Sequence, residues 1–267
     1  MVKVNFFDKR VIKKFLEVTA VVSGTLSFVV IFVDVPAEWK LKAGLAFLAI
    51  LALTYLAIWL WSNNLNSIDI NVEGSDVAIK TGDIFQQPGL KAIAFNEYFD
   101  TQVDNKIIGE TSLNGVFIQK HLGVPLSELD RHIEEYAFDN SEVLDENEAR
   151  KQGKKKRYQI GTICLYKDYL LTAFSKFDEN NKALLTMPEY LEFLINFWDK
   201  VNNIYAQQSV STTIFGSGIT RIKGHKNISD EDLLKIMLWT FRISEMRFKY
   251  PAKLTIVIHE DKIDQIN

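Results

Sequence analysis

Two long apolar runs near the amino terminus constrain this chain more than any other feature. They cover Val18–Val33 and Ala43–Trp61, with the short polar sequence DVPAEWKLK between them. At about 1.5 Å of rise per residue, a helix over the second run would span roughly 28 Å, close to the thickness of a bilayer core. The first would span about 24 Å and needs Phe15 and Leu16, or local membrane thinning, to cross. We predict a hairpin over residues 18–61 that crosses a membrane twice.

The segment before the first run predicts the orientation of the hairpin. Residues 1–17 carry Lys3, Lys9, Arg10, Lys13 and Lys14. Under the positive-inside rule this basic segment stays in the cytoplasm, so both termini of a two-span chain are cytoplasmic. A cleaved signal peptide is the first alternative, but an A-x-A type site is missing and a second apolar run follows at once. A buried hairpin of a soluble protein is the second; tryptophans at the run ends favour the membrane interface.

Neither run contains Asp, Glu, Lys or Arg. A proton relay or an ion-coupled transporter needs a charged group within the membrane, so this composition argues against transport. Ser23, Gly24 and Ser27 either mark a close helix contact or face lipid.

After Ser62 the sequence predicts one α/β domain over residues 62–267. Alternating or short apolar runs predict strands at 67–72, 77–80, 91–96, 160–166, 169–174, 210–215 and 254–259. Helical spacing predicts a loop entering a helix at 109–121 and helices at 126–138, 188–206 and 230–247. Strands that alternate with helices indicate a mixed sheet covered on both faces. The charged segment 139–157 is interpreted as a solvated loop, with a docking patch as the alternative.

The composition excludes several function classes. A net charge of −3 gives no electrostatic case for nucleic-acid binding. The four histidines show no metal-ligand spacing, and no G-x-S-x-G sequence marks a nucleophile. The single cysteine, Cys164, lies in an apolar run and cannot form an intramolecular disulfide, which fits a buried thiol in a reducing compartment. We expect no metal, no cofactor and no catalytic residue.

Three strand ends carry unusual turns: Thr81–Ile84, Asn96–Thr101 and Gly216–Arg221. Ligands of open α/β sheets bind outside the carboxyl ends of strands. In the third turn, GSGITR, glycines let backbone N–H groups approach a phosphate, and Arg221 can add charge-assisted hydrogen bonds. The turn is neither a P-loop nor a Rossmann fingerprint, and an ordinary tight turn is the alternative.

The order strand–GDI–strand–Asn-containing loop–helix, closing with strand–GSGI, resembles a macro domain, the ADP-ribose-binding module, from about Ser67 to His259. The strings NEYFDT, LLTAFSKFDENNKA and FGSGITR, behind two membrane helices, resemble the membrane-anchored macro effectors of bacterial Thoeris anti-phage systems. The resemblance implies a three-layer α/β/α fold.

The resemblance also implies roles for individual residues. Asp83 would accept from the adenine amino group, with Ile84 beside it, and Asn96 would face the distal ribose. Ser112 and Gly115 would serve the first phosphate loop, and the second would consist of Gly216, Ser217, Gly218, Ile219 and Thr220. Glu97, Tyr98 and Arg221 are expected to read the group beyond ADP-ribose. Turn capping is the less favoured alternative for Asp83, and hydrogen bonding to backbone groups is the less favoured alternative for Asn96. Asp100, Asp104 and Glu110 could line the pocket, but exposed loop carboxylates are the commoner case.

The function implied by the resemblance is a ligand-gated effector in the bacterial inner membrane. A TIR-domain partner would make an ADP-ribose derivative of the histidine-ADP-ribose type, and its binding would drive homo-oligomerisation, damage to membrane lipids by the hairpin, and abortive infection. A membrane-anchored ADP-ribosyl hydrolase is the alternative. It is disfavoured because hydrolytic relatives often have a second Asn where this chain has Phe99. A nucleotide sensor that recruits a protein through 139–157 is the third reading.

Overall fold

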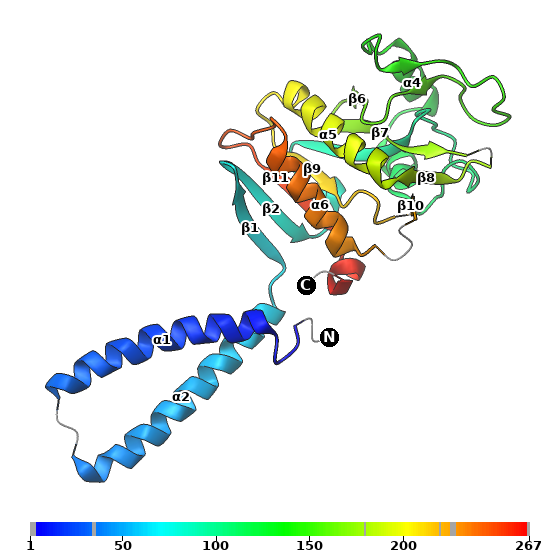
Figure 1. Ribbon diagram of the computed structural model, residues 1–267. Helices are drawn as coiled ribbons and strands as arrows, with labels where there is room; N and C mark the ends of the chain where they lie inside the picture. Colours follow the sequence, from blue (N-terminus) through cyan, green and yellow to red (C-terminus); the bar gives the residue numbers. More distant parts are fainter. Residues whose placement is uncertain (1–3, 34–35, 179, 219, 225–227, 266–267) are drawn as a thin grey trace. The chain divides into compact units, whose positions relative to one another are not determined.

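The computed structural model describes residues 4–33, 36–178, 180–218, 220–224 and 228–265. The chain divides into two compact units, with the boundary between Asn66 and Ser67 (Figure 1). The first unit contains the hairpin, and the second contains the α/β domain.

The first unit consists of two long apolar helices, α1 (Lys9–Phe32) and α2 (Ala37–Asn63). Asp8 caps α1, because its carboxylate accepts from the Arg10 N–H at 2.8 Å. Both helices are long and apolar enough to cross a membrane, with mean hydropathies of 2.0 and 2.2 in their most apolar windows. The predicted pair of helices is therefore confirmed. Each helix begins before its apolar run, so the basic residues from Lys9 onward belong to α1 itself.

An aromatic cluster ties the amino-terminal residues to the end of α2. The Trp59 indole N–H donates to the Val4 carbonyl at 3.0 Å, and the Val4 N–H donates to Asn63 Oδ1 at 2.9 Å. The Phe6 ring lies 5.0 Å from that of Tyr55 and 5.4 Å from that of Trp59, in edge-to-face geometry. These contacts hold the open end of the hairpin together.

A mixed sheet forms the centre of the second unit. Its strands are β1 (Ser67–Val72), β2 (Ser75–Thr81), β3 (Leu90–Asn96), β6 (Ile163–Tyr166), β7 (Tyr169–Phe177), β8 (Ala183–Thr186), β9 (Val210–Thr213), β10 (Arg221–Lys223) and β11 (Leu254–Ile258). Their order is β1-β2-β11-β9-β3-β7-β8-β10, with β6 beside β7. The run β2-β11-β9-β3-β7 is parallel, so its carboxyl ends meet at one edge of the sheet. A separate small sheet pairs β4 (Val143–Leu144) with β5 (Arg157–Tyr158).

Helices cover both faces of the sheet (Figure 1). The helices are α3 (Leu113–Val116), α4 (Leu126–Glu135), α5 (Met187–Ile204) and α6 (Asp230–Ile243), with short helical turns η1 (Ile84–Gln86), η2 (Phe117–His121) and η3 (Glu260–Gln265). Thr186 with Glu189, and Ser229 with Asp232, form capping boxes that start α5 and α6.

Two core clusters fill the layers on either side of the sheet. Ile256 belongs to the same buried cluster as Trp198 of α5 and Phe241 of α6, whereas its neighbour Val257 belongs to the cluster that contains Leu129 of α4. Alternate residues of a strand point to opposite faces, so this division places one cluster in each layer. The predicted three-layer α/β/α arrangement with a mixed sheet is confirmed.

The structure corrects several sequence-based boundaries. Helix α4 ends at Glu135 and α6 at Ile243, before the predicted ends at 138 and 247. Beyond α6 the chain turns extended at Ser244, and Arg247 donates to the Ser244 carbonyl at 2.7 Å. The short strands β8 and β10 were not predicted; they depend on pairing with each other and with β7.

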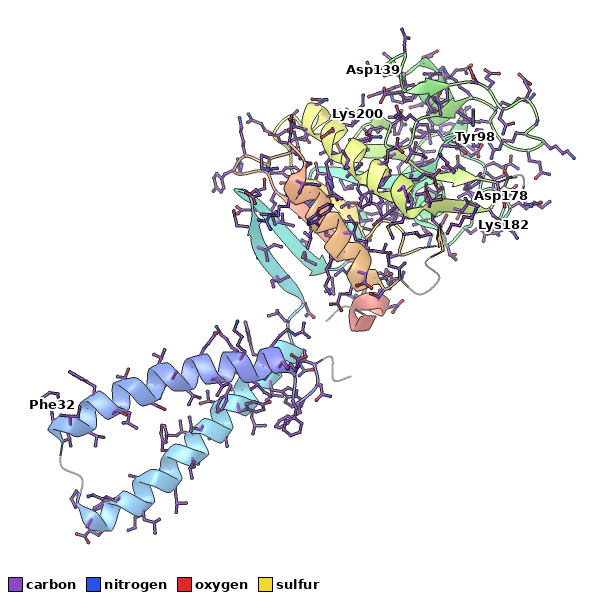
Figure 2. All side chains as sticks on the ribbon, in the orientation of Figure 1. Phe32, Tyr98, Asp139, Asp178, Lys182 and Lys200 are labelled. Atoms are coloured by element: carbon purple, nitrogen blue, oxygen red, sulfur yellow. The ribbon has the colours of Figure 1, made fainter. Side chains whose placement is uncertain are left out.

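The segment 139–157 is more ordered than a solvated loop. Besides the β4 pairing, Lys200 of α5 lies 2.9 Å from Asp139 and 3.0 Å from Glu142 (Figure 2). The side chain of Arg150 is only 6% exposed. The interpretation as a simple solvated loop is therefore wrong for this part of the segment.

Candidate functional site

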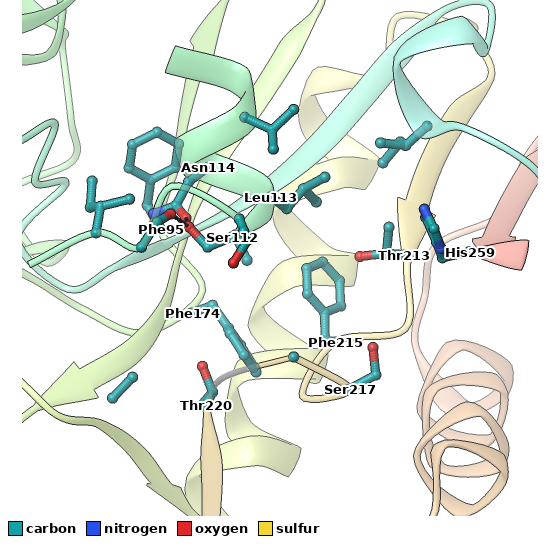
Figure 3. A pocket seen from close by; sticks show the side chains of 18 of the residues that line it. Phe95, Ser112, Leu113, Asn114, Phe174, Thr213, Phe215, Ser217, Thr220 and His259 are labelled. Atoms are coloured by element: carbon teal, nitrogen blue, oxygen red, sulfur yellow. Dashed lines mark hydrogen bonds between the residues drawn. The ribbon is translucent and has the colours of Figure 1, made fainter. Parts of the chain in front are cut away.

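A cavity of about 1190 Å³ lies where the carboxyl ends of the parallel strands meet. Each strand end contributes to its wall: Asp83 after β2, Asn96 at the end of β3, Phe215 after β9 and His259 after β11. Figure 3 shows Phe215, Ser217 and Thr220 around the same space as Ser112 to Asn114. The location is the one at which α/β sheets bind ligands, as the three strand-end turns predict.

Asp83 lines the cavity and also caps a turn. Its Oδ1 accepts from the Phe85 N–H at 2.9 Å at the start of η1, while the residue stays exposed. The preceding residue, Gly82, donates its N–H to the Ile258 carbonyl at 3.1 Å and has a φ of +148°. Glycine adopts such a φ without a steric cost, which explains the GDI sequence at this point. Ile84 is buried and lines the cavity next to Asp83.

Two buried side chains contact the glycine-rich turn that follows β9. The Tyr190 hydroxyl of α5 donates to the Phe215 carbonyl at 2.9 Å, and the Phe215 N–H lies 3.3 Å from Met237 Sδ of α6. Gly216 has a φ of +86°, a conformation that favours glycine. The wall includes Gly216, Ser217, Gly218 and Thr220. Ile219 lies outside the described residues, and Arg221 is described only as the first residue of β10.

The first predicted phosphate loop forms the opposite wall. Ser112 lines the cavity and caps α3, its Oγ accepting from the Gly115 N–H at 3.2 Å. Gly115 is buried and is not among the described residues of the wall. A Cβ on Gly115 would lie 2.2 Å from the Gly109 carbonyl oxygen, so the glycine permits close packing within the loop.

The Asn96 side chain lines the cavity and shapes the turn that follows it. Its Oδ1 accepts from the Tyr98 N–H at 3.0 Å and the Asp100 N–H at 3.3 Å, and its Nδ2 donates to Asp100 Oδ2 at 2.9 Å. Phe99 takes a φ of +48° in this turn. Its ring is fully buried, 5.1 Å from the Tyr158 ring, in the core layer that contains α4.

Glu97 and Tyr98 are buried, and the described cavity wall does not include them. Glu97 Oε1 accepts from the Phe177 N–H at 3.1 Å. Burial raises the pKa of Glu97, opposed by this hydrogen bond and by the charges of Arg157, Lys176 and Arg150. The Tyr98 ring lies 3.8 Å from the Arg150 guanidinium carbon, and its hydroxyl accepts from Asn147 at 2.9 Å. Glu97 thus contacts the backbone of the wall residue Phe177, whereas Tyr98 contacts Asn147 and Arg150 of the segment 139–157.

The remaining acidic candidates, Asp100, Asp104 and Glu110, differ in burial and in hydrogen bonding. Asp100 is 1% exposed and bonded to Arg150, so the expectation of an exposed loop carboxylate is wrong for this residue. Asp104 accepts from the Ile107 N–H at 2.7 Å, which lowers its pKa. Glu110 is exposed.

Some wall residues were not singled out from the sequence. Phe85 and His121 stack with ring centroids 3.8 Å apart at an interplanar angle of 5°. Lys262 of η3 contacts the Ser217 carbonyl, and its Nζ lies 3.3 Å from Asp230 Oδ2 at the start of α6. The position of Phe85 directly after the GDI sequence was a signal for its place in the wall. The contact of Lys262 with Ser217 joins segments that are distant in sequence, so no local pattern predicts it.

The histidine and cysteine expectations can be compared with the described part of the chain. No group of three or more His, Cys, Asp or Glu side chains suited to a metal ion occurs there. Burial raises the pKa of the Cys164 thiol to about 12, so the thiol is protonated at neutral pH and unsuited to metal binding.

A mixed three-layer domain with a Gly-Asp-Ile turn and a Gly-Ser-Gly turn that line one cavity has the features of a macro domain, here preceded by two long apolar helices. The family model described as "Thoeris protein ThsA, Macro domain" matches residues 77–259. Thoeris protein ThsA of Bacillus amyloliquefaciens (strain Y2) is 36% identical over 265 residues, covering 97% of this chain and 88% of that protein. The chain belongs to the Thoeris ThsA macro-domain family.

Solved macrodomains show weaker similarity. The Oceanobacillus iheyensis macrodomain with ADP is 14% identical with a TM-score of 0.40, covering 74% of this chain and 90% of that one. The same macrodomain with MES bound is 14% identical with a TM-score of 0.39, covering 74% and 90%.

Proposed function

We propose that this protein is a membrane effector of anti-phage defence whose macro domain binds an ADP-ribose derivative made by a TIR-domain partner. Binding drives assembly of several copies, and the assembled hairpins disrupt the bacterial inner membrane and kill the infected cell. Both termini and the macro domain are cytoplasmic in this proposal. Membership in the ThsA family supports the defence role.

The observation that carries the ligand assignment is that Asp83 and the Gly216–Gly218 turn line the same cavity. A carboxylate suits an exocyclic amino group, and backbone N–H groups of a glycine turn suit diphosphate oxygens. Lys262 places a cation beside that turn. The volume of about 1190 Å³ exceeds the usual range for small-ligand sites, so it has room for an ADP-ribose group with a further substituent.

Binding without hydrolysis is supported by Phe99. Its ring is buried among Phe95, Phe138 and Tyr158, so the position offers no polar group to a ligand. Measured hydrolase activity would replace this proposal with the alternative of a membrane-anchored ADP-ribosyl hydrolase.

The experiment adds ADP-ribose, or histidine-conjugated ADP-ribose, to the full chain in lipid nanodiscs and vesicles. Calorimetry measures binding, mass photometry measures assembly, and chromatography follows the ligand and an ADP-ribosylated peptide over time. The proposal expects binding, a higher mass, and intact ligand and peptide. Multiple turnovers of the peptide would establish a hydrolase, and binding at unchanged mass would reject the gating step.

A further inference from the structure

The outer strand β1 has an unprotected edge. The sheet order begins at β1, whose pairing partner within the described residues is β2. Ser67, Ile68, Asp69 and Asn71 are exposed, and Ile68 retains 48% of its accessible surface. Protected edges usually carry several charges, a proline or a bulge, because an open edge accepts another strand. β1 contains one charged residue, no proline and no register shift.

The backbone of β1 is arranged to receive a partner strand. Glu73 and Gly74 have φ values of 49° and 85° and form a two-residue hairpin turn between Val72 and Ser75. In such a hairpin the closing pair is hydrogen-bonded and the pattern alternates along the strand. The N–H and C=O groups of Ser67, Asp69 and Asn71 therefore point away from β2, toward solvent.

We propose that β1 pairs antiparallel with β1 of a second copy, centred on Ile70, and that this pairing is a contact of the assembled state. In this register Ile70 lies opposite Ile70 of the second copy, and Ile68 lies opposite Val72 of the second copy. These pairs extend the apolar face that packs on the core. On the other face Asp69 lies opposite Asn71, so the carboxylates do not oppose each other. Asp69 and Asn71 then exchange both outward backbone hydrogen bonds, as the outward groups require.

Neighbouring registers fit less well. Centring the pair on Asp69 places two carboxylates opposite each other, and centring it on Asn71 places Asp69 opposite Glu73. Like charges directly opposite are destabilising in a sheet. The register centred on Ile70 therefore avoids opposed like charges, whereas the registers centred on Asp69 and Asn71 do not.

The symmetry of this pairing suits chains anchored in one membrane. An antiparallel pair within one sheet is related by a two-fold axis perpendicular to the sheet, and this axis keeps both copies of any attached segment on the same side. Three residues, 64–66, separate α2 from β1. Confinement to a bilayer would raise the effective concentration of the two edges.

The test uses the full chain in lipid vesicles with histidine-conjugated ADP-ribose and compares Ile70→Cys with Ser67→Cys under mild oxidation. The paired Cα atoms at position 70 would lie about 4.5 Å apart, within disulfide range. The Ser67 positions would lie about 20 Å apart. Ile70→Cys should form about tenfold more covalent dimer than Ser67→Cys. Buried Cys164 is common to both variants.

Equal cross-linking, stronger cross-linking through position 67, or none through position 70 would overturn the proposed pairing. As a second measurement, Asp69→Pro removes an outward N–H that β2 does not use, so it should abolish assembly and preserve thermal stability and ADP-ribose binding. Asp69→Ser should still assemble. The inference rests on the proposed assembly, but calorimetry on the same samples separates the two: absent ligand binding rejects the proposed function, whereas the cross-linking pattern decides the interface.

Discussion

Arg150 Nη2 lies 2.6 Å from Asp100 Oδ2, and Nη1 lies 3.1 Å from Oδ1, in a pair whose side chains are 6% and 1% exposed. Asp100 also binds Asn96, and Arg150 Nη2 donates to Asn181 Oδ1 at 3.0 Å. Asn96 and Asn181 both line the cavity. The pair therefore joins two walls of the cavity to the segment 139–157.

Replacing Arg150 with Ala should destabilise the domain by about 3–5 kcal/mol, because it leaves Asp100 buried without its partner. ADP-ribose affinity should fall as well, since Asn96 and Asn181 lose their shared support. Thermal unfolding followed by circular dichroism, together with calorimetry, measures both effects. Lys155→Ala is the control: Lys155 pairs with Glu148 at 2.6 Å but both are exposed, so no measurable change is expected. Equal unfolding temperatures for the two variants would refute the structural role.

Asp83→Asn separates turn capping from ligand recognition. The asparagine Oδ1 can still accept from the Phe85 N–H, so the unfolding temperature should not change. The second side-chain atom becomes a donor and repels the amino group that we assign to it. ADP-ribose affinity should drop about tenfold, equal to about 1.4 kcal/mol. Unchanged affinity would remove Asp83 from the binding site.

The two glycines of the turn after β9 should respond differently to alanine. Gly216 has a φ of +86°, so Gly216→Ala should cost about 1 kcal/mol of stability. Among the described residues other than its chain neighbours, no atom lies within 4 Å of a Cβ added at Gly218, so Gly218→Ala should fold normally. Its methyl group would stand where a phosphate approaches and should weaken ADP-ribose binding. Calorimetry measures ADP-ribose affinity and thermal unfolding measures stability for both variants. A Gly216→Ala protein with unchanged stability and affinity would contradict the prediction for Gly216.

Glu97 should make stability depend on pH. Burial raises its pKa above 4.5 in the folded state, so the folded protein binds the proton more tightly than the unfolded chain does. Stability should therefore fall as pH rises from the unfolded pKa through the folded one. Glu97→Gln keeps an oxygen for the Phe177 N–H and should raise the unfolding temperature at pH 7 but not at pH 4. The same increase in unfolding temperature at both pH values would show that the raised pKa of Glu97 is not the cause of the pH dependence.

The sequence predicted the elements whose signals are local. The hairpin, the buried strands and the GDI and GSG turns follow from hydrophobic period and glycine chemistry. Strands β8 and β10 are short and depend on tertiary pairing, so periodicity did not reveal them. Arg150 lies in a charged run typical of solvated loops, and only the distant Asp100 explains its burial. Glu97 and Tyr98 directly follow Asn96 in sequence, but both are buried against protein groups and neither is among the described wall residues.

The central claim, that the macro domain is the sensor and the hairpin is the output, is tested most directly by dye release from vesicles. The full chain and a variant with residues 18–61 replaced by an unrelated single-span anchor are compared after addition of histidine-conjugated ADP-ribose. We predict equal ligand affinity in both, with dye release from the full chain alone. Equal release from the variant would show that the hairpin is only a tether and would contradict the account.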